Sequence, residues 1–204
     1  MNNYLICKDV TEAQKWFDDN FKEFINKIYA EKDISGTLGE ILFCYTGNMS
    51  RIYNNLLMAS GGLIELDKLR PNNENYREYI NEIMVIADSF YNRIPNNIVL
   101  FHYCDSHAIG KVKRGSELCL NKFISTSLLK KFPGYRGLMK RNDYDVLFII
   151  KVPKGIPCIP IGNDYETCLR EFEVILHPDT KLHISKKYFS FVDFMTIIEC
   201  EVID

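Results

Sequence analysis

Three short polar motifs in the second half of the chain have side chains that can do chemistry. They are His102 inside an apolar run, the Ser-Thr-Ser sequence at residues 125–127, and the pair Glu171 and Glu173. Alternation along a strand would put Glu171 and Glu173 on one face, with Phe172 on the other. Two neighbouring carboxylates repel each other, so a partly buried pair indicates a use. Such a pair can stabilise a developing positive charge and accept a proton.

Each motif, taken alone, has an ordinary structural explanation. Glu-x-Glu on a strand is more often a solvated face, and Ser-Thr-Ser more often supplies hydroxyls to a sheet surface. A histidine such as His102 is more often a core residue whose hydrogen bonds are satisfied. The chemical interpretation therefore depends on whether strand ends bring the three motifs together in space.

The first half of the sequence has the pattern of helices that would pack against those strands. Thr11 to Gln14 matches a capping box, and apolar residues follow it at helical spacing. A turn at residues 46–48 would separate the next two helices, and Gly61 with Gly62 would close the second. A further helix carries four apolar residues on one stripe: Tyr79, Ile83, Ile86 and Phe90. The predicted helices cover residues 11–30, 36–44, 49–59 and 74–92.

The second half changes to short runs rich in β-forming residues, most of them separated by Gly or Pro. The predicted strands cover residues 98–103, 121–127, 145–152, 171–176, 181–185 and 195–202. Helices first and strands afterwards indicate an α+β fold with helices packed on antiparallel sheets. No GxGxxG motif is present, so a dinucleotide-binding Rossmann fold is disfavoured.

Composition and charge argue against several classes of function. The chain carries 25 Lys and Arg against 27 Asp and Glu, so its charge does not favour a nucleic acid as partner. No segment approaches the length of a membrane span and the N-terminus has no secretion signal. We expect a soluble protein that acts in the cytoplasm of its source or reaches a target cell without a classical signal peptide. Seven cysteines without paired CxxC spacing indicate free thiols rather than a metal site.

In their order and setting the three motifs resemble the bacterial-toxin-like mono-ADP-ribosyltransferases, whose pattern is Arg, then Ser-Thr-Ser, then Glu-x-Glu. The resemblance extends to residues 45–57, which are similar to the Tyr-Thr-Gly helix of that family, and to the strand at residues 96–103. It also covers the turn at residues 112–115. Residues 165–181 resemble the catalytic loop, the Glu-x-Glu strand and the turn after it. The match extends over most of the chain from about residue 45.

The resemblance implies an enzyme that splits NAD+ and transfers ADP-ribose to a macromolecular acceptor. Position 171 is Glu rather than Gln, and in this family that implies a protein arginine as the acceptor. The resemblance further implies that Glu173 stabilises the oxocarbenium-like ribose, that Glu171 handles the acceptor, and that Ser125 steadies the nicotinamide pocket and the glutamate. It implies no metal. Six more residues would bind NAD+: His102, Tyr103, Thr126, Ser127, Asn54 and Tyr45.

The sequence departs from the family pattern at His102, which occupies the position of the arginine that grips the NAD+ phosphates. Histidine is not a permanently charged bidentate fork. A related branch, the diphtheria-toxin and poly-ADP-ribose-polymerase type, uses histidine there to bond ribose hydroxyls. We expect phosphate contact to come from Arg136 or Arg141, which match the phosphate-nicotinamide loop of the family by position. The alternative for that loop is a basic solvated turn.

We therefore expect one α+β ADP-ribosyltransferase domain over residues 1–204. A helical lobe at residues 1–94 would pack on a β core of two antiparallel sheets at residues 95–204, with NAD+ in the cleft between them. The alternatives are an NAD+ glycohydrolase on the same fold and a binding module that has lost its activity. The presence of Ser125, Glu171 and Glu173 favours an active enzyme.

Overall fold

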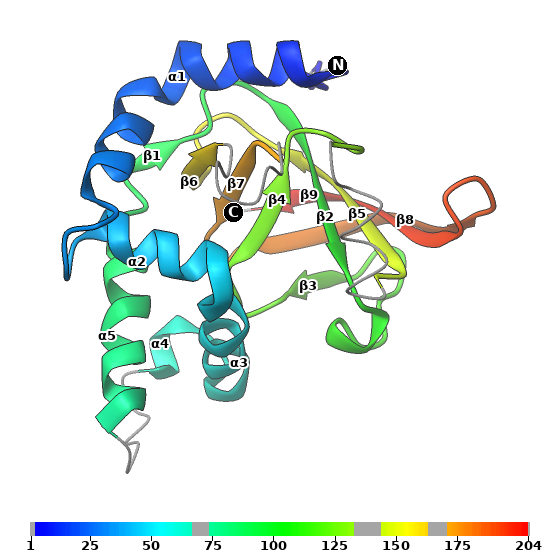
Figure 1. Cartoon of the computed structure of the whole chain (residues 1–204). Coiled ribbons are helices and arrows are strands. Elements are labelled where there is room, and N and C mark those ends of the chain that lie inside the picture. Colours follow the sequence, from blue (N-terminus) through cyan, green and yellow to red (C-terminus); the bar gives the residue numbers. More distant parts are fainter. Residues whose placement is uncertain (1–2, 67–73, 133–143, 163–170, 204) are drawn as a thin grey trace.

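The computed structural model describes residues 3–66, 74–132, 144–162 and 171–203 (Figure 1). Helices come first along the chain and strands follow, which confirms the α+β class predicted from the sequence. The helices are α1 (Val10–Glu31), α2 (Leu38–Cys44), α3 (Ser50–Ser60), α4 (Leu63–Leu66) and α5 (Glu74–Asp88), with a short 3-10 turn at Ser106–Ala108. Among the described residues, none of the helices combines the length and apolar character that a membrane crossing requires.

Helix α1 begins with an aspartate cap that fixes its first turn. The Asp9 side chain accepts a hydrogen bond from the Glu12 backbone N–H at 2.9 Å, and the Glu12 carboxylate accepts one from the Lys8 N–H at 2.9 Å. The predicted capping box at Thr11 is therefore wrong by two residues, because aspartate is as good an N-cap as threonine or better. The buried face of α1 carries Ala13, Trp16, Phe17, Phe21 and Ile28.

Helices α2 and α3 are joined by a π-helical turn, η1 (Tyr45–Met49), where the sequence predicted a break at residues 46–48. The Ser50 N–H bonds to the Tyr45 carbonyl, so the chain continues as a helix through Gly47. A single π-turn inserted in a helix redirects side chains and is frequent at functional sites. The predicted close at Gly61 is confirmed, since this residue caps α3 with a left-handed φ of 85°.

Helix α5 ends at Asp88, four residues earlier than predicted, because Asn92 and Arg93 form the short strand β1 (Asn92–Arg93). The predicted apolar stripe is confirmed. Ile83 and Ile86 are fully buried, and Tyr79 and Phe90 pack against the same cluster.

The strands form one hydrogen-bonded sheet within the described residues, in the order β1-β6-β7-β4-β2-β5-β9-β8-β3. Their bounds are β2 (Ile98–Cys104), β3 (Glu117–Cys119), β4 (Ile124–Ser127), β5 (Val146–Val152), β6 (Pro157–Gly162), β7 (Glu173–Leu176), β8 (Lys181–Ser190) and β9 (Met195–Ile203). Strands β2 and β4 are paired at Phe101 and Ser127, and this pairing joins a half containing β1, β6, β7 and β4 to a half containing β2, β5, β9, β8 and β3.

This arrangement corrects the prediction of two wholly antiparallel sheets. The two halves share the β2–β4 pairing, and β5 pairs with β9 in parallel. Strands β1, β3 and β6 were not predicted. Strand β6 contains Pro157 and Pro160, which lack an N–H, and its pairing with β7 shifts register between Pro160 and Gly162. Strand β8 extends beyond the prediction to Ser190, because its far half is exposed and lacks apolar alternation.

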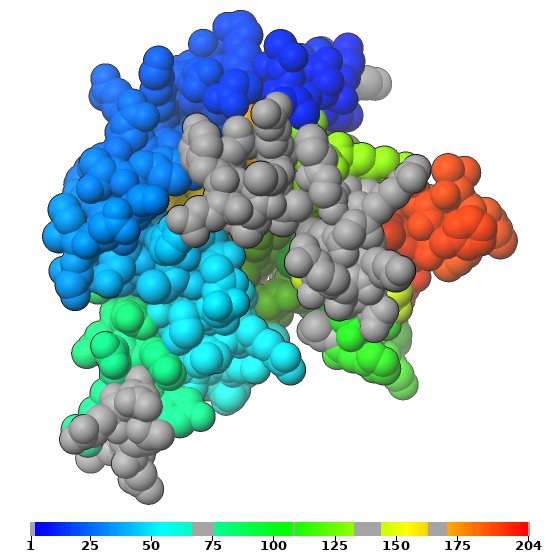
Figure 2. Space-filling view, viewed as in Figure 1, coloured from blue at the N-terminus to red at the C-terminus, as the bar shows by residue number. Residues whose placement is uncertain are grey.

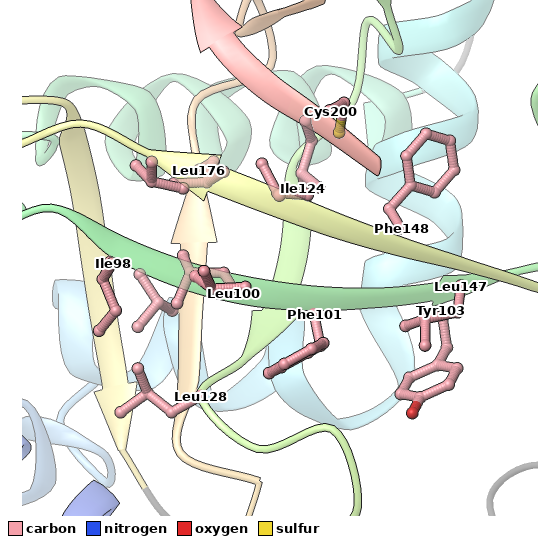
Figure 3. Close-up of a cluster of buried hydrophobic side chains, with 14 of the residues drawn as sticks. Ile98, Leu100, Phe101, Tyr103, Ile124, Leu128, Leu147, Phe148, Leu176 and Cys200 are labelled. Atoms are coloured by element: carbon pink, nitrogen blue, oxygen red, sulfur yellow. The ribbon is translucent and has the colours of Figure 1, made fainter. Parts of the chain in front are cut away.

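Two hydrophobic clusters attach the helices to the sheet. The larger contains the buried face of α1 and the centres of β2, β4, β5, β7 and β9. Figure 3 shows Leu100, Ile124, Phe148, Leu176 and Cys200 of this cluster on neighbouring strands. The smaller cluster joins α2, α3 and α5 to Phe123, Ile159 and Ile175. Together they fix the start of β4 against α3, close to where the polar motifs meet.

Candidate active site

A cavity of about 590 Å³ is lined by residues of the π-turn, helix α3 and strands β2, β4 and β7. Figure 2 shows this face hollowed between the helices coloured cyan and the strands coloured green. His102, Ser125, Glu171 and Glu173 all line the cavity. The three motifs that the sequence places far apart are therefore brought together.

Ser125 links the other two motifs by hydrogen bonds. Its Oγ–H donates to the Glu173 Oε1, and its carbonyl oxygen lies 2.6 Å from the His102 Nδ1. The antiparallel pairing of β4 with β7 allows the first bond. Ser127 is directly opposite Glu173, so Ser125, two residues earlier on the same face, is the diagonal neighbour of Glu173. A carboxylate that accepts a hydroxyl proton in this way is held in one rotamer.

Glu171 reaches the cavity by a bend of the backbone rather than by strand alternation. Strand β7 begins at Glu173, and Phe172 before it has a φ of 51°, in the left-handed region that non-glycine residues seldom adopt. The Phe172 side chain is fully buried and packs on Phe17 of α1, with ring centroids 5.8 Å apart. The predicted strand at Glu171 is therefore wrong, while the expectation that both glutamates face one site is met by the cavity lining.

The two hydroxyls that follow Ser125 hold the strand ends in place. Thr126 Oγ1 donates to the Val174 carbonyl at 2.6 Å, and Ser127 Oγ donates to the Glu171 carbonyl at 2.5 Å. Both residues are buried. Ser127 Oγ also accepts a hydrogen bond from the Leu129 N–H at 2.9 Å. The two hydroxyls therefore position the segment that carries the two carboxylates and link it to the chain after β4.

Two residues from the helices complete the wall of the cavity. Asn54 on α3 accepts a hydrogen bond from the Phe123 N–H at 3.0 Å, which ties α3 to the start of β4. Tyr45, on the π-turn, is buried and packs edge-on against Phe123, with ring centroids 5.5 Å apart. These contacts explain how the segment at residues 45–57, which resembles the Tyr-Thr-Gly helix, reaches the Ser-Thr-Ser strand.

The whole chain superposes on solved structures of known enzymes. The C3 exoenzyme of Clostridium limosum matches with a TM-score of 0.69 and 19% identity, over 100% of this chain and 98% of that one. An ADP-ribosyltransferase from Clostridium botulinum matches with a TM-score of 0.68 and 19% identity, over 100% of both chains. A protein from S. aureus, solved with NAD, matches with a TM-score of 0.67 and 16% identity over 99% of each chain. The chain has the ADP-ribosyltransferase fold. No family model and no curated protein matches the sequence.

Three predicted residues remain: Tyr103, Arg136 and Arg141. Tyr103 lines the cavity, and its hydroxyl donates to the Lys130 carbonyl, so this oxygen holds the chain beyond β4. Arg136 and Arg141, from which the sequence predicted a phosphate contact, lie outside the described residues. That prediction stays untested.

Sequence reasoning missed two cations and two helix residues of the cavity wall: Arg51, Lys122, Thr46 and Ser50. Arg51 and Ser50 belong to the segment that resembles the Tyr-Thr-Gly helix, so helical spacing from Asn54 would have indicated them. Lys122 gave no signal, because a lysine is ordinarily solvated. The predicted strand at residues 121–127 includes it, but β4 begins only at Ile124. Within the described ranges, six cysteines are free and no cluster of His, Cys, Asp and Glu is arranged to hold a metal ion.

His102 is a neutral histidine in this structure. Burial, and then the positive charge of Lys122, lower its pKa to about 3. The partner of Nδ1 is a carbonyl oxygen, which only accepts, so Nδ1 carries the proton and donates to Ser125. The Nε2 atom is then an acceptor, and it is buried with no hydrogen-bond partner in the described part of the chain.

The low pKa of His102 predicts acid sensitivity of the fold. An unfolded histidine binds a proton below a pH of about 6.5, whereas the folded one stays neutral down to about 3. Between these values the unfolded state binds more protons, so this group makes the free energy of unfolding fall by up to about 1.4 kcal/mol per unit of decreasing pH. Urea unfolding at pH 7 and pH 5 measures the slope. His102→Asn should reduce it, and an unchanged slope would contradict a neutral His102.

Proposed function

We propose that the chain is a mono-ADP-ribosyltransferase that cleaves NAD+ and transfers ADP-ribose to protein arginine, acting as one domain over residues 1–204. The observation that carries this proposal is the hydrogen bond from Ser125 to Glu173 inside a cavity that Glu171 and His102 also line. The ADP-ribosyltransferase fold of the whole chain supports it, as does the NAD bound in the S. aureus neighbour.

The geometry supports a dissociative cleavage assisted by Glu173. The bond between the ribose C1′ and the nicotinamide nitrogen breaks, and its electron pair leaves with the nicotinamide, which becomes neutral. C1′ then has oxocarbenium character, and the Glu173 carboxylate stabilises its positive charge. Ser125 keeps that carboxylate in one rotamer, so little reorganisation accompanies the reaction.

Glu171 is suited to the second half of the reaction. A nitrogen of the acceptor guanidinium forms a bond to C1′, and the proton that it loses passes to the Glu171 carboxylate. The bend at Phe172 places Glu171 just before the start of β7 instead of within the sheet. The Ser127 hydroxyl fixes the Glu171 backbone by donating to its carbonyl oxygen. The half-buried Glu171 side chain is therefore accessible to a second substrate at the cavity wall.

His102 is suited to hold the sugar rather than the phosphates. Its neutral ring offers Nε2 as an acceptor, which matches a ribose hydroxyl donor. We expect His102→Ala to raise the KM for NAD+ by about 3- to 10-fold, the size of one neutral hydrogen bond, with a smaller change in kcat.

Restoring arginine at this position tests the same assignment from the other side. His102→Arg should weaken NAD+ binding, because a permanent charge replaces a buried neutral acceptor next to Lys122. Steady-state kinetics of the two variants, with thermal melting as the folding control, measure both effects. Tighter NAD+ binding by His102→Arg would show that the site is a weakened arginine-type pocket.

Incubation of the purified chain with labelled NAD+ and a cell lysate tests the proposed function. A transferase attaches the label to proteins, and hydroxylamine then releases it as expected for an arginine linkage. Free labelled ADP-ribose without protein label would identify an NAD+ glycohydrolase, and unchanged NAD+ would contradict both activities.

A further inference from the structure

A buried lysine lies in the wall of the same cavity. Lys122 lies two residues before the start of β4 and is 9% exposed. It lines the cavity beside His102 and Cys104, and its charge acts on both of them. Arg51 also lines the cavity, but it is exposed to solvent, where its charge is hydrated and screened.

Lys122 has no hydrogen bond and no ion pair in the part of the chain that the structure describes. The two carboxylates near Cys104 form no ion pair with Lys122: Asp105, which also lines the cavity, accepts from the His107 N–H at 2.8 Å, and Asp145 accepts from the Ser106 N–H at 2.7 Å. A buried cation without a counter-ion is strongly unfavourable.

The neighbouring titratable side chains do not neutralise this charge. His102 is neutral, and burial raises the pKa of the Cys104 thiol to about 12, so it is not a thiolate. Burial lowers the pKa of Lys122 itself, because the charged form is disfavoured where no anion compensates the lost hydration. Among the described residues, the cavity therefore combines the carboxylates of Asp105, Glu171 and Glu173 with the buried cation Lys122.

We propose that the Lys122 ammonium binds the pyrophosphate of NAD+ and supplies the positive charge that His102 does not. This rests on the proposed function, because it assigns the group that holds the substrate of that reaction. The charges of the cavity complement those of NAD+, whose nicotinamide is cationic and whose pyrophosphate is anionic. A lysine ammonium binds phosphate as a compact point charge.

The test compares binding of ADP-ribose and of adenosine to the full chain and to Lys122→Met, by titration calorimetry. Methionine keeps the length of the side chain and removes its charge. We expect ADP-ribose to bind roughly 10- to 100-fold more weakly to the variant, the size of a charge-assisted hydrogen bond, and adenosine to bind as to the wild-type chain. The matched control is Lys181→Met, at an exposed lysine on β8, which should bind both ligands normally.

Two outcomes would overturn the assignment. One is unchanged ADP-ribose affinity in a folded Lys122→Met variant, and the other is an equal loss for adenosine, which would indicate a structural role. Thermal melting with and without inorganic pyrophosphate gives a second measurement. Pyrophosphate should raise the Tm of the wild-type chain and not that of Lys122→Met, and an equal rise in both would also contradict the proposal.

Failure of this assignment is distinguishable from failure of the proposed function. If Lys122→Met cleaves NAD+ with an unchanged KM, the function stands and the pyrophosphate contact does not. If the wild-type chain binds ADP-ribose through Lys122 but leaves NAD+ intact, the contact stands and the transferase function does not.

Discussion

Glu173→Gln is expected to slow both NAD+ cleavage and ADP-ribose transfer by roughly 100- to 1,000-fold, the range found when one preorganised electrostatic group is lost. Glutamine keeps the shape of the side chain and an oxygen that can accept the proton of the Ser125 hydroxyl. It removes the negative charge that, in the proposed mechanism, stabilises the ribose cation. The rate of nicotinamide release measures the effect, and thermal melting checks the fold.

Glu117→Gln is the matched control, because Glu117 is exposed on β3 and does not line the cavity. It should leave both rates unchanged. Retained NAD+ cleavage by a folded Glu173→Gln variant would show that Glu173 is not the carboxylate that stabilises the transition state.

Glu171→Gln is expected to separate the two half-reactions. Transfer to a guanidino acceptor such as agmatine should fall by about 100-fold or more, the contribution typical of general base catalysis. Cleavage of NAD+ with water as acceptor should stay close to the wild-type rate, because Glu173 and its bond to Ser125 are intact. Nicotinamide release and agmatine labelling, measured in the same reaction, give the ratio of the two activities.

A proportional loss of both activities in Glu171→Gln would contradict separate roles for the two glutamates. It would indicate that Glu171 acts on the cleavage step or holds the conformation at Phe172. The urea midpoint of the variant distinguishes these two explanations, because a disturbed bend would expose the buried Phe172 ring and lower stability.

Much of the fold could be predicted from the sequence, because the patterns that define it are local. The apolar run at residues 98–103 predicted β2, and the stripe of Ile83 and Ile86 predicted α5. The meeting of His102, Ser125 and Glu173 followed from a resemblance in the order of motifs and not from any local rule. The pairing of β4 between β2 and β7 is the physical reason that they meet.

The features that the sequence did not predict depend on tertiary contacts. The π-turn at Tyr45 forms where Tyr45 packs on Phe123, although Gly47 indicated a break. The left-handed Phe172 is held by burial against Phe17, which overrides the steric preference of its backbone. Burial of Lys122 likewise depends on β2 and β4 being neighbours, so a lysine next to Phe123 gave no indication of a site.

A crystal structure of the Glu173→Gln variant, soaked briefly with NAD+, tests the central claim most directly, since this variant should cleave the substrate slowly. We predict that the nicotinamide ribose lies against the side chain at position 173, with a ribose hydroxyl on the His102 Nε2 and the pyrophosphate on Lys122. NAD+ bound outside this cavity, or with its ribose turned away from position 173, would contradict the account.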